Sequence, residues 1–133
     1  MPKKLTNKQA KKKATDLFQE IIRSLGYCEN CQKDSGVQFQ GAHIVTRNRS
    51  WTRTDFQNAY CLCAGCHRHF HDYPRQFSHF ITDSWAGKTY DEMEFRSLES
   101  HPNKFDWHKR LEELKDIQQQ LDSGEITLKA LRS

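Results

Sequence analysis

The sequence has few hydrophobic residues and no long apolar run. Hydrophobic residues make up 35% of the 133 residues and charged residues 29%, so the core should be small. No run approaches the roughly 18–20 apolar residues that a membrane-spanning helix needs, and the first four residues, MPKK, lack the apolar stretch of a secretory signal. Internal repeats and low-complexity tracts are also absent. We therefore expect one modest domain with no membrane partner.

The excess of basic residues is mild and unevenly distributed. The formal net charge is +4 with neutral histidines, which is compatible with a polyanion partner but not diagnostic of one. Lysines crowd the N-terminal end at positions 3, 4, 8, 11, 12 and 13. They suit either a solvated helix start or an arm that contacts phosphates, and the sequence leaves both interpretations open.

Four of the five cysteines form two Cys-x-x-Cys pairs. Two thiolates separated by two residues can bind one metal ion from a tight turn, and two such turns supply the four sulfurs of a closed tetrahedral zinc site. Reduced metal-binding cysteines are typical of the cytoplasm. The fifth, Cys61, pairs poorly with Cys63 and is expected to be a small buried residue. We predict a structural Zn²⁺ bound by Cys28, Cys31, Cys63 and Cys66.

Hydrophobic spacing and helix-end signals predict helices at both ends of the chain. Residues 27–62 offer only short apolar pieces, which indicate strands and irregular segments. Thr89 with Glu92 resembles a capping box. We expect a basic N-terminal helix over residues 1–26, a core over 27–87 and a helical appendage over 88–133, all within one domain. The predicted helices cover residues 6–25, 64–72 and 74–85, a short stretch from 89, and 106–124.

Two histidines and an asparagine lie within or directly beside the cysteine framework. His43 stands between the two cysteine pairs, Asn58 precedes Cys63 by five residues, and His67 follows the second pair directly. With the four cysteines, this spacing over residues 27–74 resembles the zinc-ribbon form of the HNH endonuclease family. In its small size the chain resembles the members of that family that bacteriophages encode. The resemblance implies a small α+β fold: a ββα-metal finger stapled by the four-cysteine zinc site and flanked by N- and C-terminal helices. It also implies that residues 27–87 form the nuclease core.

The resemblance assigns a role to each of these residues. His43 matches the general base, Asn58 the residue that fixes the loop between the strands, and His67 a ligand of a catalytic Mg²⁺, Mn²⁺ or Ni²⁺. Phosphodiester hydrolysis needs a base to activate water and a cation to hold the phosphate, and the ordinary pKa of histidine suits a base at neutral pH. Without the resemblance, His43 would be read as a histidine linking a strand to its loop, and Asn58 as an ordinary turn residue.

Helical spacing suggests a second ligand for this cation. His71 lies four residues after His67 on the predicted helix, so both share one face and His71 matches a further ligand of some family branches. The alternative is a histidine-rich helix end on the surface, and His69 should point elsewhere. Many members carry a metal ligand directly before the base, but here that residue is Ala42. Asp55 is one side chain that we consider as a replacement.

A basic loop follows His43. Arg47, Arg49 and Arg53 flank Trp51, where the family approaches the DNA backbone, and arginine forks match phosphate oxygens well. A solvated polar loop is the alternative. No segment resembles a helix that reads base edges, so we expect specificity for sequence to be low or to be directed by the structure of the nucleic acid.

We therefore expect a metal-dependent DNA endonuclease, making nicks or double-strand breaks, in the cytoplasm, or the host cytoplasm if a phage encodes it. The alternatives are a non-catalytic zinc-ribbon module that binds nucleic acid or protein, and a nuclease acting on branched DNA or RNA. The acidic helix near the C-terminus, with Glu112, Glu113 and Asp116, leaves three options open. It can dock on the core, pair with a second copy of the chain, or recruit a protein partner.

Overall fold

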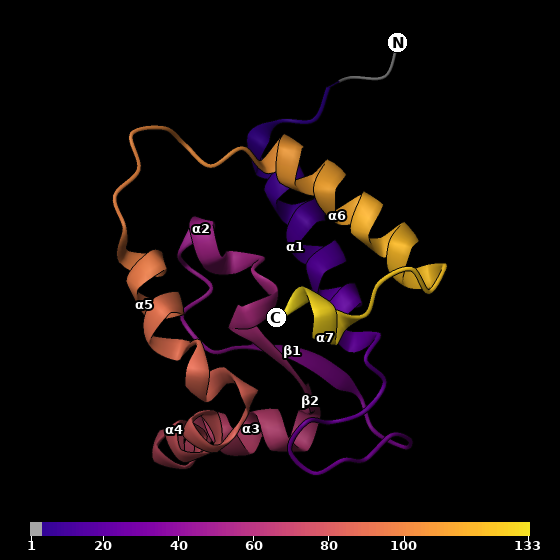
Figure 1. The fold of residues 1–133 in the computed structure, drawn as a ribbon, viewed down its shortest axis with the longest axis vertical. Coiled ribbons are helices and arrows are strands. Elements are labelled where there is room, and N and C mark those ends of the chain that lie inside the picture. The colour runs from indigo at the N-terminus through magenta and orange to yellow at the C-terminus, as the bar shows by residue number, and fades with distance from the viewer. Residues whose placement is uncertain (1–3) are drawn as a thin grey trace.

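The chain folds around a pair of short antiparallel strands that lies between two groups of helices (Figure 1). The computed structural model describes residues 4–133; Lys3, counted above in the basic start, lies outside them. The small α+β class expected from the sequence is confirmed. The elements in chain order are α1 (Asn7–Arg23), β1 (Phe39–His43), α2 (Ser50–Arg53), the 3₁₀ turn η1 (Phe56–Asn58), β2 (Ala59–Cys63), α3 (Ala64–Asp72), α4 (Pro74–Asp83), the 3₁₀ turn η2 (Trp85–Lys88), α5 (Tyr90–Leu98), α6 (Trp107–Asp122) and α7 (Leu128–Leu131).

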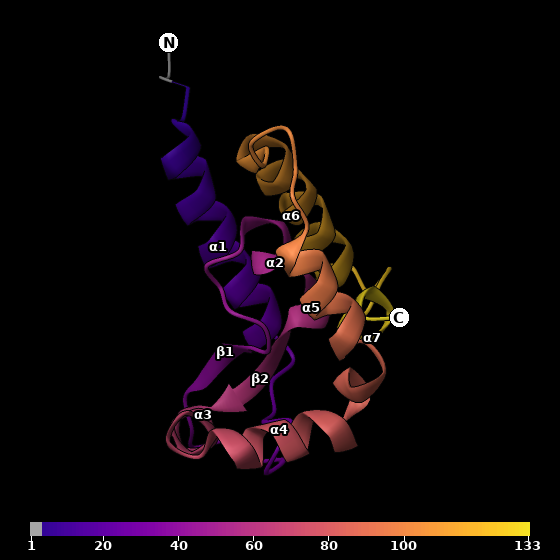
Figure 2. The ribbon, with the colours of Figure 1, turned by 90° about the vertical axis from the view of Figure 1, so that its left-hand side faces the viewer.

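The two long helices, α1 and α6, lie side by side (Figures 1 and 2). Thr6 and Gln9 form a reciprocal capping box at the start of α1, with each side chain bonded to the other residue's backbone N–H. Asp106 caps α6 by accepting a hydrogen bond from the backbone N–H of Lys109 at 3.0 Å. The apolar stripe of α6 is buried against α1, so this helix docks on its own chain.

The strand β2 connects two separate hydrophobic clusters. It pairs with β1 in the register Phe39↔Cys63 to His43↔Ala59 and runs directly into α3. Successive side chains of a strand point to opposite faces. Ala59 and Cys61 therefore join the cluster beneath α1 and α6, whereas Tyr60 and Leu62 join the cluster beneath α3 and α4. Figure 2 shows α3 and α4 at the end of the molecule away from the start of α1.

Several helix boundaries differ from those predicted. The prediction for α3 is confirmed, but α4 ends at Asp83 because Ser84 adopts extended backbone angles and caps η2 instead. The predicted Thr89–Glu92 capping box is wrong. Thr89 has helical backbone angles, makes no side-chain cap for α5, and directs its hydroxyl to the Ala86 carbonyl at 3.4 Å.

The segment after α7 is anchored on the first cysteine turn. The Arg132 guanidinium donates to both carboxylate oxygens of Glu29, at 2.7 and 3.1 Å, and the two side chains are only 9% and 10% exposed. The guanidinium carbon also lies 4.3 Å from the ring centroid of Trp85. Glu29 further accepts hydrogen bonds from the Trp85 indole and from the backbone N–H of Cys61. This buried ion pair joins the last residues of the chain to the first cysteine turn.

We expect Arg132→Ala to lower the free energy of unfolding by about 3 kcal/mol, because it leaves the Glu29 carboxylate buried without its counter-charge. Urea denaturation measures the loss. The matched control is Lys115→Ala, which removes an exposed pair with Glu112 and should cost less than about 1 kcal/mol. Equal midpoints for the two variants would show that the ion pair contributes nothing.

Candidate functional site

The four paired cysteines converge on one point. The Sγ atoms of Cys28, Cys31, Cys63 and Cys66 all lie within 4.8 Å of one another, and Cys31 and Cys63 are separated by 3.8 Å. A tetrahedron with Zn–S bonds of about 2.3 Å has sulfur–sulfur edges of about 3.8 Å. Within residues 4–133, no other group of three or more Cys, His, Asp or Glu side chains brings its ligand atoms this close. The clustering expected from the sequence is confirmed.

Both cysteine turns direct backbone N–H groups at sulfur. Cys31 N–H points to Cys28 Sγ at 3.5 Å, and Cys66 N–H points to Cys63 Sγ at 3.4 Å. The Asn30 amide adds a contact of 3.3 Å to Cys66 Sγ. Burial works to raise the pKa of the Cys28 thiol, but neighbouring backbone N–H groups lower it to about 7. For Cys66, burial instead raises the thiol pKa to about 12. N–H groups thus reach three of the four sulfurs, and the four cysteines together are a donor set that fits a Zn²⁺ ion.

Cys61 takes no part in this cluster. Its side chain is fully buried beneath α1, and burial raises the pKa of its thiol to about 11. The prediction that Cys61 is a small buried residue is confirmed.

Three histidines line one pocket beside the cysteine cluster. The pocket has a volume of about 250 Å³ and lies between β1, α3 and the start of α4. His43 stands at the end of β1, and His67 and His71 face the pocket from successive turns of α3. His69 does not line the pocket; its ring Nε2 lies 2.5 Å from the Gln76 amide oxygen. The lining residues are Ala42, His43, Leu62, His67, Phe70, His71, Pro74 and Phe77.

Within residues 4–133, one ring nitrogen of His43 is hydrogen-bonded and the other has no hydrogen-bond partner. Its Nε2 lies 2.8 Å from the backbone carbonyl oxygen of Arg53, which can only accept, so Nε2 carries the proton. Nδ1 is then the basic nitrogen. Burial lowers the pKa of His43, and the bond to the Arg53 carbonyl offsets this only in part. The ring is therefore neutral at pH 7 and able to accept a proton.

Asn58 holds the segment between the strands. Its side chain is fully buried, and its amide oxygen accepts a hydrogen bond from Val45 N–H at 2.7 Å. Its amide nitrogen donates to the carbonyls of Val45 at 3.2 Å and Thr52 at 2.9 Å. These bonds fix the backbone directly before Arg53, the residue whose carbonyl orients His43.

His67 is oriented by a residue that no sequence pattern singles out. Its Nδ1 lies 2.7 Å from the side-chain oxygen of Gln40 on β1, so Nδ1 carries the proton and Nε2 is free to bind a cation. Burial, and then the nearby charge of His71, lower the pKa of His67. Histidines that bind metals commonly have this arrangement of one bonded and one free nitrogen.

Few other side chains of the histidine pocket could serve as ligands of a cation. His71 is exposed, with Nδ1 3.7 Å from Asp72, and Ala42 has no ligand atom. Asp55 is not a replacement, because it does not line the pocket. Its carboxylate accepts from Gln57 N–H at 2.9 Å and pairs with Arg96 at 3.2 Å. The pocket lining therefore offers the two α3 histidines, His67 and His71, as candidate ligands and contains no carboxylate.

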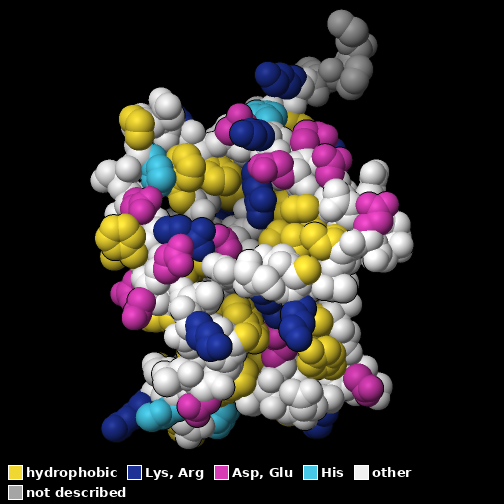
Figure 3. All heavy atoms as spheres, in the orientation of Figure 1, with side chains coloured by type: hydrophobic (Ala, Val, Ile, Leu, Met, Phe, Trp, Pro, Cys, Tyr) yellow, Lys and Arg dark blue, Asp and Glu magenta, His cyan; other side chains and the backbone are white. Residues whose placement is uncertain are grey.

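Of the three loop arginines, two point to solvent. Arg47 and Arg49 are exposed. Arg53 is engaged internally, donating to Thr15 Oγ1 at 2.9 Å and to the Arg47 carbonyl at 2.7 Å. Its guanidinium therefore ties the loop to α1, whereas the side chains of Arg47 and Arg49 remain exposed. Figure 3 shows basic and acidic side chains interspersed on the face drawn there, with no continuous basic patch.

Among residues 4–133, no helix is both long and apolar enough to cross a membrane. Comparison of the chain with known protein families, curated proteins and solved structures finds no match. Inference about function therefore rests on the geometry of the cysteine cluster and the histidine pocket.

Proposed function

We propose that this protein is a metal-dependent endonuclease of the HNH type, which hydrolyses DNA phosphodiester bonds in the histidine pocket. One observation carries the proposal: His43 and His67 line the same pocket, and each has one ring nitrogen bonded to a protein oxygen and the other free. The order of two antiparallel strands followed by a helix supports it. So does the cysteine cluster, which we propose binds a structural Zn²⁺.

The residues of the pocket divide the chemistry between them. Neutral His43 removes a proton from the attacking water through Nδ1, while the Arg53 carbonyl holds the ring and stabilises the imidazolium that results. His67 and His71 would hold a divalent cation, which when bound neutralises charge on the phosphate and the departing oxygen. Asn58 and Gln40 do not touch substrate in this scheme; they position the base and the ligand.

The cysteine cluster lies at the N-terminal end of α3, the helix that carries two of the pocket histidines. Cys66 is the residue directly before His67, and Cys63 is the N-cap of α3. A zinc ion bound there would fix the start of α3 against the turn of residues 28–31, and with it the direction of the histidine face. Zinc therefore has a structural role in this scheme, separate from the cation in the pocket.

A non-catalytic zinc-ribbon module, binding nucleic acid or protein, is the second candidate. The lack of a ligand at Ala42 and the exposure of His71 favour it. Incubation of the zinc-loaded protein with supercoiled plasmid and Mg²⁺, Mn²⁺ or Ni²⁺ separates the two candidates. An endonuclease converts the plasmid to nicked or linear forms, and a binding module leaves it intact with every cation.

We expect the double variant Arg47→Ala, Arg49→Ala to bind duplex DNA more weakly and to reduce the slope of log affinity against log salt by up to about 2, because each phosphate contact releases a counterion. Fluorescence anisotropy at several salt concentrations measures both quantities. The control is Arg23→Ala, Lys129→Ala, which removes the same charge from exposed positions elsewhere. Identical slopes for the two double variants would exclude the loop from the interface.

A further inference from the structure

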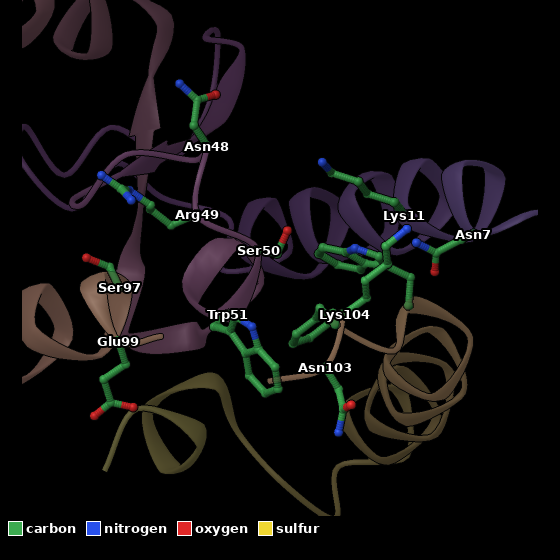
Figure 4. A pocket seen from close by; sticks show the side chains of 12 residues that line it. Asn7, Lys11, Asn48, Arg49, Ser50, Trp51, Ser97, Glu99, Asn103 and Lys104 are labelled. Atoms are coloured by element: carbon green, nitrogen blue, oxygen red, sulfur yellow. The ribbon is translucent and has the colours of Figure 1, made fainter. Parts of the chain in front are cut away.

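A second pocket lies between the start of α1, α2 and the linker that joins α5 to α6. It is open and has a volume of about 430 Å³, within the roughly 300–1,000 Å³ of small-ligand sites. It shares no lining residue with the histidine pocket. In Figure 4, Ser50 and Trp51 lie between Arg49 on one side and Asn7, Lys11 and Lys104 on the other. We call it the Trp51 pocket.

Trp51 presents a rigid aromatic surface in this pocket. Trp51 is 44% exposed, yet its indole stacks on His101 with ring centroids 3.6 Å apart and an interplanar angle of 15°. Phe105 packs edge-on at 5.0 Å. The neighbours therefore hold the indole in place while part of it remains open. Because the indole is already held in place, binding a ligand that stacks on it would cost little side-chain entropy.

The charged residues around the indole are mostly basic. Lys11 comes from α1, Arg49 from the loop and Lys104 from the linker. Among residues 4–133, no carboxylate lies within 4.0 Å of any of their side-chain nitrogens. The acidic Glu99 also lines the pocket, and its ion-pair contact is with His101 at 4.0 Å. Three basic side chains therefore line the same pocket as one exposed aromatic ring.

We propose that the Trp51 pocket binds one unpaired nucleotide of a nucleic-acid substrate, with the base stacked on Trp51 and the flanking phosphates held by Lys11, Arg49 and Lys104. Aromatic side chains beside basic residues bind single strands because every base has a flat face and every linkage has a charge. Bases inside a duplex are already stacked on one another, so they are not free to stack on the Trp51 indole.

The position of the pocket connects it to the histidine pocket. Trp51 is followed in the chain by Thr52 and Arg53. The Thr52 carbonyl accepts a hydrogen bond from the Asn58 side chain, and the Arg53 carbonyl orients His43. An unpaired nucleotide bound at Trp51 would thus lie against the same short segment that positions His43, the proposed general base. This inference rests on the proposed nuclease function, and it names the substrate class as nucleic acid with unpaired nucleotides near the cut.

The test measures binding without cleavage, using zinc-loaded full-length protein that carries His43→Ala. The probes are a fluorescein-labelled oligothymidylate and a duplex of the same length, both followed by anisotropy. Trp51→Ala should weaken oligothymidylate binding by roughly 10- to 100-fold and leave duplex binding unchanged. Phe95→Ala removes a similarly exposed aromatic ring from α5, outside the pocket, and should change neither affinity.

Two further variants remain decisive if Trp51→Ala fails to fold. Trp51→Phe should retain most of the single-strand affinity because phenylalanine also stacks. Lys104→Gln, an exposed substitution, should reduce the salt slope for oligothymidylate by up to about 0.7 and leave the duplex slope unchanged.

The inference is overturned if Trp51→Ala and Lys104→Gln both bind oligothymidylate as the parent does, or if each loses affinity for oligothymidylate and for the duplex equally. Cleavage separates it from the proposed function. If the protein cleaves no nucleic acid but Trp51→Ala loses single-strand affinity, the result supports the nucleotide site and contradicts the nuclease function. If the protein cleaves DNA and Trp51→Ala keeps its single-strand affinity, the result supports the nuclease function and contradicts the nucleotide site.

Discussion

Replacing His43 by alanine is expected to lower the rate of DNA cleavage by about 10²–10⁴-fold, the usual contribution of a general base. The variant lacks the group that accepts the proton of water, whereas His67, His71 and the exposed arginines keep their positions. Binding of DNA and of the divalent cation should therefore persist. Single-turnover nicking with the protein in excess measures the chemical step, and anisotropy measures DNA affinity.

The matched control for this variant is His79→Ala. His79 is an exposed histidine on α4 that does not line the pocket, so its loss should leave the cleavage rate unchanged. His43→Gln adds a second comparison, because an amide can still donate to the Arg53 carbonyl but is not basic. Cleavage by His43→Gln at the wild-type rate would mean that His43 only supports the loop.

Loss of zinc is expected to unfold the protein. The hydrophobic core is split into two clusters that meet at β2, and the cysteine cluster lies at the end of that strand. Structural zinc contributes about 10–16 kcal/mol of apparent binding free energy in small domains, as much as the whole stability of an ordinary domain. Cys28→Ser should therefore abolish the cooperative thermal transition followed by circular dichroism.

Cys61→Ala is the matched control for the zinc experiment. It removes a buried sulfur from the same strand without touching the cluster, so it should keep one bound zinc per chain and a cooperative transition. Alanine is preferred to serine because it places no polar group at this fully buried position. A zinc-free protein with the same melting temperature as the zinc-loaded form would contradict the structural role.

The features predicted correctly from the sequence depend on neighbours in the chain. Thr6 and Asp106 cap helices through residues three positions away, and the two Cys-x-x-Cys turns bring their own sulfurs together. The feature that failed locally, the Thr89 cap, failed because η2 determines the backbone angles of Thr89.

The features that were missed depend on residues far apart in the sequence. Glu29 and Arg132 are common residue types separated by 103 positions, so nothing marks them as partners. Arg53 was grouped with Arg47 and Arg49, because the Thr15 hydroxyl that binds it lies 38 positions away on α1. His43 and His67, which the sequence singled out, line one pocket, but spacing could not identify Gln40 as the partner of His67.

The most direct test of the central claim is a divalent-cation titration of plasmid nicking by the zinc-loaded wild type, His67→Ala and His43→Ala. If His67 binds the cation and His43 is the base, His67→Ala needs more Mg²⁺ or Mn²⁺ but recovers activity, since water can replace one ligand. His43→Ala stays slow at every concentration, since no cation supplies the missing base. Cleavage that is independent of added cation, or equal rescue of both variants, would contradict the proposed mechanism.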